Sequence, residues 1–182
     1  MGLNMECKKL HIGPGKVYLP GWVNVDIFSN VKADLYASAL AIPYPQESFD
    51  LIYSGHVLEH INRNVTLSAL THWRSLLRPC GILRLAVPNF QAIVDHYNKH
   101  GQLKILLGLL YGGQKFMLDS HCVVFDPDYL RECLSTVGFK TIRMWDWRDT
   151  EHAEYDDFAQ AYLPHLQKDT GLLVSLNMEA IK

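Results

Sequence analysis

The chain has 182 residues, enough for one domain with a sizeable core. Its residues are 48% apolar and 20% charged, which is typical of a globular protein and excludes a disordered or fibrous one. The formal net charge of -2 gives no electrostatic footprint for nucleic acid, and no basic helix or lysine tract indicates membrane binding. We expect a single domain over residues 1–182, with neither nucleic acid nor membrane as a partner.

The cysteines and the apolar runs bear on the cellular compartment. Four cysteines are scattered without a CxxC pair, as in a reduced protein: Cys7, Cys80, Cys122 and Cys133. The first residues lack the charged and apolar regions of a signal peptide, and the longest apolar patch, 105–111, is too short to cross a bilayer. These features predict a cytoplasmic protein.

Short apolar runs at 8–12, 23–27, 50–54 and 82–87 predict buried parallel strands. Apolar residues at helical spacing predict a helix before the last of these runs: Leu67, Leu70, Trp73, Leu76 and Leu77. Arg78-Pro-Cys-Gly81 should end that helix.

The second half of the chain predicts further helices and two late strands. Pro88-Asn89 should open a helix with Ile93, Val94 and Tyr97 on its apolar face, and 101–124 should form a helix followed by a loop at its Gly-Gly pair. Asp126-Pro127 is a strong helix start, and Gly138 is a natural stop for that helix.

The last two predicted strands, 140–147 and 172–181, are joined by a long insert, which suits an antiparallel edge on a parallel sheet. Strands that alternate with helices predict an α/β doubly wound sheet with right-handed crossovers.

A glycine loop follows the first predicted strand, in Leu10-His-Ile-Gly-Pro-Gly15. Glycines at this place let a ligand approach the backbone. Asp26, at the end of the next strand, can accept both ribose hydroxyls of an adenosine-containing cofactor. The pattern predicts a cofactor site at this edge of the sheet.

The connection between these two strands is short. Only residues 13–21 separate them, fewer than the dozen or so that a helical crossover needs. We therefore expect the first crossover helix to be absent or reduced to a turn. A pyrophosphate would lose the helix N-terminus that usually binds it, so the loop favours a cofactor without phosphates over NAD or FAD.

The chain as a whole resembles the class I S-adenosylmethionine-dependent methyltransferases, and most of all a small type 11-like branch of them. Three groups of residues carry the resemblance in the first half of the chain: Leu10–Gly15 with Leu19-Pro-Gly-Trp-Val-Asn-Val-Asp-Ile27, Ser48-Phe-Asp-Leu-Ile-Tyr53 with His56-Val-Leu-Glu-His60, and Leu77-Arg-Pro-Cys-Gly-Ile-Leu83 with Val87-Pro-Asn89. Later elements match too, among them Tyr111-Gly-Gly-Gln114, Ala161-Tyr-Leu-Pro-His165 and Ser175–Ala180.

The resemblance implies a Rossmann-like fold with a mostly parallel seven-stranded sheet, an antiparallel last strand, and S-adenosylmethionine as cofactor. It implies cofactor contacts from two groups of residues: Gly13, Pro14, Gly15 and Asp26, then Ser38, Leu40, Ser54 and Gly55. The acid that often lies beside adenine in this superfamily falls near Ser38, where a hydroxyl or backbone amide would replace it.

The resemblance further implies transfer of a methyl group to an unidentified acceptor, a small molecule or a glycan-related compound. His56 is the first candidate for a general base and His121 the second. An alternative is a catalytically silent module that binds S-adenosylmethionine or S-adenosylhomocysteine, which the short first crossover and the missing acid near Ser38 favour.

The letters His56-x-x-Glu59-His60 also match the HxxEH pattern of inverted zinc proteases. Zinc would need a third ligand, for which the sequence offers Glu132, Glu151 and Glu154 outside any motif. The preceding strand puts the histidine pair at the first turn of a helix and not mid-helix. We therefore expect no metal site, and we expect Glu59 and His60 to be helix-start residues.

The insert over residues 146–165 is rich in acidic and aromatic residues. Such a segment is usually a solvated loop, but in this fold it lies where a substrate cover is common. Together with one histidine upstream, it provides candidates for contact with the acceptor: His121, Asp156, Asp157, Gln160 and His165.

Overall fold

Seven strands form one sheet in the computed structural model, which describes residues 7–182. Their order is β3-β2-β1-β4-β5-β9-β6, with β9 antiparallel to both of its neighbours and the first five strands parallel to one another. The strands are β1 Lys9–Ile12, β2 Val23–Asp26, β3 Leu35–Tyr36, β4 Phe49–Gly55, β5 Leu77–Pro88, β6 Thr141–Met144 and β9 Ser175–Ile181. The predicted mostly parallel α/β sheet with an antiparallel last strand is confirmed.

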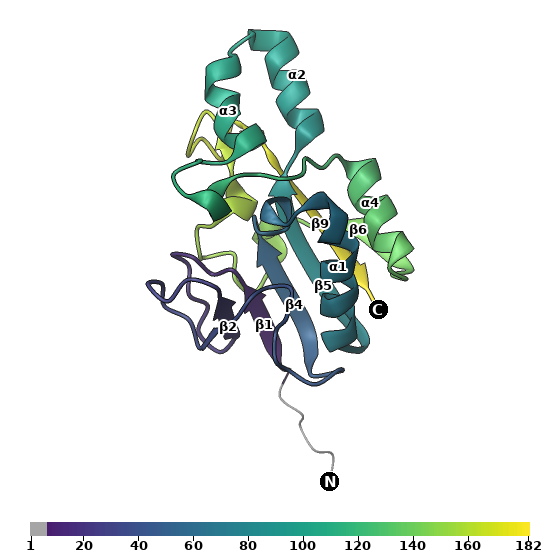
Figure 1. Ribbon diagram of the computed structural model, residues 1–182. Helices are drawn as coiled ribbons and strands as arrows, with labels where there is room; N and C mark the ends of the chain where they lie inside the picture. Colours follow the sequence, from purple (N-terminus) through teal and green to yellow (C-terminus); the bar gives the residue numbers. More distant parts are fainter. Residues whose placement is uncertain (1–6) are drawn as a thin grey trace.

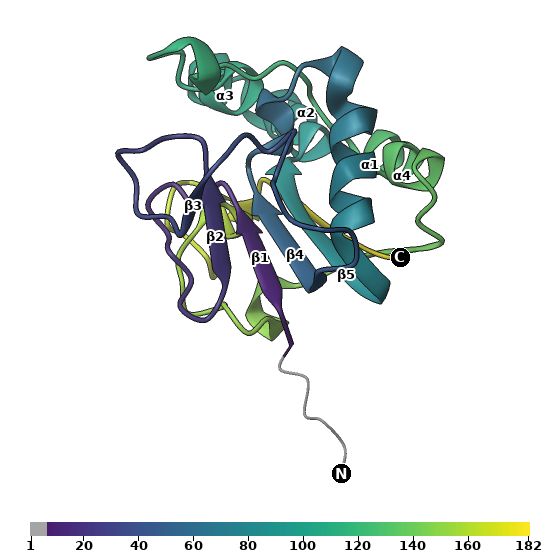
Figure 2. The same ribbon diagram turned by 60° about the horizontal axis from the view of Figure 1, so that its bottom comes forward.

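The α-helices are not shared equally between the two faces of this sheet (Figures 1 and 2). The α-helices are α1 Thr66–Leu76, α2 Phe90–His100, α3 Leu103–Tyr111 and α4 Pro127–Thr136. The described residues also form five 3-10 turns: η1 Leu58–His60, η2 Arg63–Val65, η3 Met117–Asp119, η4 Trp147–Asp149 and η5 Phe158–Gln160. Asp126 caps α4 by accepting a 2.8 Å hydrogen bond from the Tyr129 amide, as the sequence predicted.

Helices α1 and α4 lie side by side against one face of the sheet, as both ribbon views show. Their buried side chains, including Trp73 and Leu130, join the main core with residues of β1, β4, β5 and β9. The indole of Trp73 also donates a 2.8 Å hydrogen bond to the carbonyl of Ala39. This bond ties the loop after β3 to α1, and so fixes a segment that contains predicted cofactor residues.

The opposite face of the sheet is covered by the insert between β6 and β9. Residues 13–22 form only turns, so the reduction of the first crossover helix is confirmed. A second apolar cluster fills the space, with Trp22 and Tyr53 from the sheet region packed against Trp145 and Tyr155 from the insert. The ring of His152 lies 4.4 Å from the ring of Tyr53, centroid to centroid, within this cluster. A loop rich in aromatic residues therefore takes the place of a helix.

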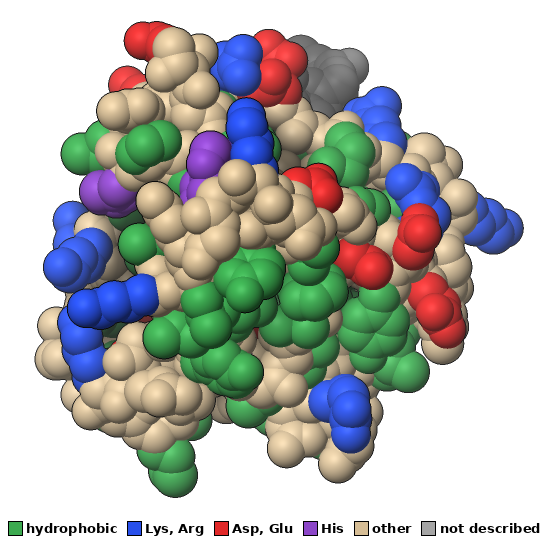
Figure 3. Space-filling model, turned by 90° about the horizontal axis from the view of Figure 1, so that it is seen from above, with side chains coloured by type: hydrophobic (Ala, Val, Ile, Leu, Met, Phe, Trp, Pro, Cys, Tyr) green, Lys and Arg blue, Asp and Glu red, His purple; other side chains and the backbone are tan. Residues whose placement is uncertain are grey.

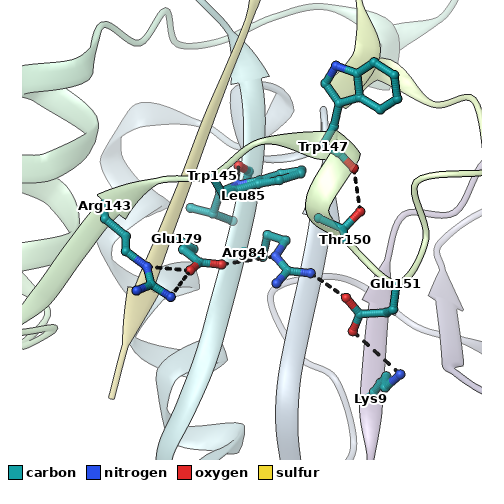
Figure 4. A network of polar contacts seen from close by, with 9 residues as sticks. All are labelled: Lys9, Arg84, Leu85, Arg143, Trp145, Trp147, Thr150, Glu151 and Glu179. Atoms are coloured by element: carbon teal, nitrogen blue, oxygen red, sulfur yellow. Dashed lines mark hydrogen bonds and ion pairs between the residues drawn. The ribbon is translucent and has the colours of Figure 1, made fainter.

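A network of ion pairs, centred on the buried Glu179 and the part-buried Arg84, fastens the insert to the sheet (Figure 4). Arg84 on β5 forms ion pairs with Glu151 of the insert at 2.9 Å and with Glu179 of β9 at 3.2 Å. Arg143 on β6 also pairs with Glu179, at 2.7 Å, and Lys9 on β1 reaches Glu151 at 3.6 Å. The network joins the insert to strands on both sides of the sheet centre.

The elements differ from the sequence-based expectations in three places. Strand β5 begins at Leu77, because this residue pairs with Phe49 before a shift in register, so the Arg78–Gly81 segment belongs to the strand. Tyr97 is exposed on α2, although its spacing predicted a core position. The last predicted strand is interrupted at Val174, which separates β9 from the short hairpin of β7 Tyr162–Leu163 and β8 Leu172–Leu173.

The end of the molecule that carries α2 and α3 is partly apolar at its surface, and Figure 3 views this end. Exposed large apolar side chains on these helices are Phe90, Tyr97, Leu103, Ile105, Leu107 and Tyr111. Among the described residues, no helix is long and apolar enough to cross a membrane.

Candidate active site

The carboxyl ends of the parallel strands meet at one edge of the sheet. Ile12 at the end of β1 is in register with Val25 of β2 and with Ser54 of β4, and Asp26 is in register with Tyr36 at the end of β3. The chain continues from β1 to β2 on one side and returns to β4 on the other. Ligands of open α/β sheets bind at such a reversal of strand order.

The glycine loop lies directly at this reversal. The amide of Gly13 donates a 2.8 Å hydrogen bond to the Val25 carbonyl, and its φ of +70° is one that residues with a side chain rarely adopt. A Cβ atom at Gly13 would overlap the side chain of Val57, which follows β4. A Cβ atom at Gly15 would meet no protein atom within 4 Å. Space beside the loop is therefore open at Gly15, while Pro14 between the two glycines is buried.

Asp26 is held with its carboxylate against the same loop. One oxygen accepts a 3.1 Å hydrogen bond from the Gly15 amide and the other a 2.9 Å bond from the Phe28 amide. Each carboxylate oxygen can accept more than one hydrogen bond, so both keep capacity for a ligand hydroxyl.

Ser38 and Leu40 follow β3 on the Asp26 side of the site. The amide of Ala37 donates a 2.9 Å hydrogen bond to the Asp26 carbonyl, which places the start of this loop beside Asp26. The Ser38 hydroxyl accepts a 3.2 Å bond from the Leu40 amide, and the Leu40 side chain is exposed. The structure thus brings the predicted adenine-side segment next to Asp26.

Ser54 and Gly55 end β4 on the opposite side of the glycine loop. The Ser54 hydroxyl is fully buried and has no hydrogen-bond partner among the described residues. A Cβ atom at Gly55 would lie 2.6 Å from the Tyr53 hydroxyl, so only glycine leaves room for the tyrosine side chain. A buried polar atom without a partner is costly in a folded protein and is common where a ligand completes the hydrogen bond.

His56 is the first residue beyond β4. Its amide donates to the Ala86 carbonyl at 2.8 Å, and its φ of +53° is unusual for a residue with a side chain. Its ring nitrogens lie between two oxygens, with Nδ1 3.2 Å from Glu59 Oε1 and Nε2 3.2 Å from the Ser175 hydroxyl. The exposed ring of Phe158 lies 5.2 Å from the imidazole, centroid to centroid.

Glu59, in η1, is wholly buried among three histidines. Burial acts to raise the pKa of its carboxyl group, but the charges of His56 and His60 and a hydrogen bond from His56 outweigh it and bring this pKa below the ordinary value. Nε2 of His121 lies 4.0 Å from Glu59 Oε1, and the pKa of His121 is lowered chiefly by burial. The two candidate bases, His56 and His121, therefore both lie near the same carboxylate oxygen, Glu59 Oε1.

The insert residues that the sequence offered for contact with the acceptor do not lie together in the structure. Asp157 accepts a 2.6 Å hydrogen bond from the Tyr53 hydroxyl, and burial is the main reason that its pKa is raised. Gln160 donates to two insert carbonyls, and Asp156 pairs with Lys168 at 2.8 Å, so both hold the insert together. His165 is exposed. Phe158, beside His56, was not among the predicted contacts, and nothing in its sequence position distinguishes it.

The acids considered as a third zinc ligand lie apart from the histidines. Glu151 belongs to the network around Arg84, and Glu132 and Glu154 are exposed. Glu59 and His60 do lie in a short helical turn after the strand, but the structure groups them with His121, 61 residues further on. Spacing alone carries no signal for a grouping over that distance.

Two surface cavities of about 360 Å³ each are found away from this edge. One is lined by residues 144–148 and Leu173, and the other by residues 7–9, 21–23 and Arg78. Neither is lined by a predicted cofactor residue. The candidate site lies at the strand ends and the glycine loop, where Asp26, Ser54 and His56 come together.

The comparisons with known proteins agree with this geometry. The methyltransferase domain family matches residues 12–143, well over half of the chain. A solved S-adenosylmethionine-dependent methyltransferase from Archaeoglobus fulgidus superposes with a TM-score of 0.63 at 14% identity, over 97% of this chain and 86% of that chain. A second, from Thermotoga maritima, superposes with a TM-score of 0.59 at 14% identity, over 99% and 84%.

A third such enzyme, from Mesorhizobium loti, superposes with a TM-score of 0.56 at 12% identity, over 96% of this chain and 90% of that one. No curated protein matches the sequence. At these identities the solved structures support the fold, and the family match is independent of them. The chain belongs to the methyltransferase domain family and has the Rossmann-like fold of class I S-adenosylmethionine-dependent methyltransferases.

Proposed function

We propose that this protein transfers a methyl group from S-adenosylmethionine to a small-molecule or glycan-related acceptor, and that residues 1–182 act as one methyltransferase domain. The observation that carries this proposal is the meeting of the glycine loop, Asp26 and the Ser54–His56 segment at the carboxyl edge of the sheet.

The residues at this edge fit S-adenosylmethionine. Open space lies beside Gly15, the Asp26 carboxylate is oriented by two amides with capacity left for hydroxyls, and the buried Ser54 hydroxyl lacks a partner. The missing first crossover helix removes a phosphate site, and this cofactor carries no phosphate. We propose Gly13, Pro14 and Gly15 under its methionine portion, Asp26 on its ribose, Ser38 and Leu40 beside its adenine, and Ser54 and Gly55 near its reactive end.

When bound, S-adenosylmethionine supplies an electrophilic methyl group on a sulfonium, whose departure as a neutral thioether needs no acid. The protein's contribution is to hold the acceptor in line with that methyl group, which alone lowers the barrier by several kcal/mol. A hydroxyl acceptor also has to lose a proton. We propose that Nε2 of His56 takes it up, while the hydrogen on Nδ1 is held by Glu59.

The Ser175 hydroxyl would assist that proton uptake. It donates a 2.8 Å hydrogen bond to the amide oxygen of Asn177, whose nitrogen is held by the Ala159 carbonyl at 2.9 Å. A serine has one hydrogen, so it either bonds Asn177 or turns toward His56. When it bonds Asn177, its lone pairs can accept a hydrogen from Nε2 of a protonated His56, which lies 3.2 Å away.

The place for the acceptor is beside His56, where Phe158 of the insert presents an exposed aromatic ring. A flat or ring-shaped acceptor can pack on this side chain. The buried bond between Asp157 and Tyr53 fixes the preceding residue, so the ring is carried by an anchored turn.

Calorimetry with S-adenosylmethionine and S-adenosylhomocysteine tests the proposal. Both should bind, and Asp26→Asn should weaken binding by roughly 10- to 100-fold, the cost of a hydrogen bond to a charged group. Asp95→Asn, on the exposed face of α2, is the control and should bind as the native protein does. Absence of binding by either cofactor form would refute the proposal. Binding without turnover on a broad panel of hydroxyl and amine acceptors would instead favour the silent module.

A further inference from the structure

We propose that Glu59, His60 and His121 form a binding site for a divalent transition-metal ion beside the acceptor position. One carboxylate oxygen and one ring nitrogen from each histidine lie within 4.8 Å of one another. Two imidazoles and one carboxylate are a donor set suited to zinc, manganese, iron or cobalt, and three protein ligands leave positions open for a substrate. This set differs from the His56–His60 pair that the HxxEH letters suggest.

The first argument is the state of Glu59. Its side chain is completely buried, and within residues 7–182 neither carboxylate oxygen has a hydrogen-bond partner other than the nearby His56 ring at 3.2 Å. A buried carboxylate with so few partners is strongly destabilising unless positive charge compensates it. The two oxygens of a carboxylate offer about four lone-pair positions. One position can accept from the His56 ring while the remaining positions are free to bind an ion.

The second argument is the orientation of the histidines. Nδ1 of His121 lies 3.0 Å from the Leu109 carbonyl, and Nδ1 of His60 lies 3.2 Å from the Ser120 carbonyl. A backbone carbonyl accepts a hydrogen, so each Nδ1 is protonated. In the neutral rings the lone pair is then on Nε2. Histidines that bind metals are typically oriented by such a bond from the other ring nitrogen.

The third argument is the separation between the side chains of His121 and Glu59. Nε2 of His121 lies 4.0 Å from the carboxylate oxygen Glu59 Oε1. The two atoms are too far apart for a hydrogen bond between them. The same separation is one that two ligands of a single ion can span, since zinc lies about 2.0–2.2 Å from nitrogen and oxygen ligands.

The backbone holds the three residues in place. The amides of Cys122 and Val123 both donate to the Glu59 carbonyl, at 2.7 and 3.2 Å, and the His121 amide donates to the Tyr111 carbonyl at 3.1 Å. Gly112 has a φ of +73°, and a Cβ atom there would overlap the Asp119 carbonyl and lie 3.0 Å from the His121 ring. The loop after α3 is therefore shaped to bring His121 onto η1.

The role of the ion, unlike its binding, rests on the proposed methyl transfer. An ion bound to Glu59 lies next to His56, because both contact the same carboxylate. There it would bind an acceptor hydroxyl, make that hydroxyl more acidic and orient it. The proton would pass to His56 as the new bond to the methyl carbon forms and the bond to sulfur breaks.

Titration of chelator-treated protein with Co²⁺, followed by its visible absorption bands, and with Zn²⁺ by calorimetry tests the site. We expect one ion per chain. His121→Ala should weaken binding by more than the roughly 10- to 100-fold that follows loss of a mere orienting partner. Glu59→Gln, which keeps the size of the side chain, should do the same. Circular dichroism shows whether each variant is folded.

His100→Ala is the matched control. His96 and His100 lie one helical turn apart on α2, with ring centroids 4.6 Å apart, and such a pair can bind ions adventitiously. The control should bind Co²⁺ as the native protein does. The proposal is overturned if the native protein binds no stoichiometric Co²⁺ or Zn²⁺, or if His100→Ala abolishes binding and His121→Ala does not.

S-adenosylhomocysteine binding is measured on the same samples. Cofactor binding without metal binding refutes the metal site and leaves the methyltransferase proposal standing. Metal binding without binding of S-adenosylmethionine or S-adenosylhomocysteine would support the metal site and refute the methyltransferase proposal.

Discussion

The Tyr53 hydroxyl donates a 2.6 Å hydrogen bond to Asp157, a residue 104 positions later in the chain. Tyr53 lies in the centre of β4 and Asp157 in the insert, so this bond joins the strand that leads into His56 to the turn that carries Phe158. The pKa of Tyr53 is raised well above its usual value, by burial first and then by the charge of Asp157. The tyrosine therefore remains a donor over the whole physiological range.

Removing this hydroxyl should loosen the insert. We expect Tyr53→Phe to lower the free energy of unfolding by about 1–3 kcal/mol, because it deprives a largely buried carboxylate of a hydrogen bond. Hydrogen exchange should rise in residues 153–163. Tyr18→Phe removes a similar 2.8 Å bond to Asp34 at an exposed site, and should change stability by less than about 0.5 kcal/mol. Equal effects of the two variants would contradict the anchoring role.

Two glycines allow the cofactor loop to be tested apart from backbone strain. Gly15 and Gly21 both have positive φ, +51° and +77°, and a Cβ atom at either would meet no protein atom within 4 Å. Alanine should therefore cost similar stability at both, about 1 kcal/mol. Only Gly15→Ala should weaken S-adenosylhomocysteine binding in calorimetry, because its methyl group occupies the space proposed for the cofactor. An equal loss of binding in Gly21→Ala would show that strain and not occupancy is responsible.

His56 should matter for turnover more than for cofactor binding. We expect His56→Ala to reduce kcat on a hydroxyl acceptor by roughly 10²- to 10⁴-fold, the usual contribution of a positioned base. Calorimetry should show S-adenosylhomocysteine affinity within a few-fold of the native value. His100→Ala, at an exposed position on α2, serves as control and should keep native turnover. A His56 variant with full kcat would rule out proton transfer by this side chain.

Stability should fall in mild acid because two histidines are buried in neutral form. Burial is the main reason that the pKa values of His11 and His152 drop to about 4, and the charge of Arg84 contributes for His152. The unfolded chain binds protons below about pH 6.5, whereas the folded chain does so only near pH 4. The free energy of unfolding should thus be intact above pH 6.5 and decline as pH falls from 6.5 to 4, by up to about 3 kcal/mol per histidine.

Urea unfolding at several pH values measures this decline. His152→Phe should flatten the slope over the same window, since it removes one of the two groups and keeps an aromatic ring beside Tyr53. His165→Gln should retain the native slope, because that histidine is exposed. An unchanged slope in His152→Phe would contradict the assignment.

The sequence alone determined the fold class and the meeting of the glycine loop with Asp26 at one edge of the sheet. Local patterns carried this information: apolar runs predict strands wherever they occur, the Asp126-Pro127 pair starts a helix by its own chemistry, and nine residues cannot form a crossover helix. Because parallel strands end at one edge, the sequence places Gly13–Gly15 and Asp26 close together.

The tertiary structure alone decided what surrounds His56. Glu59 and His60 read as helix-start residues, and no periodicity links them to His121, to Ser175 on the last strand or to Phe158 in the insert. These contacts join segments separated by loops whose paths depend on packing, and sequence patterns report only on neighbours along the chain. The meeting of the glycine loop and Asp26 follows from local rules, whereas the histidine cluster around Glu59 exists only because the loop after α3 folds back onto η1.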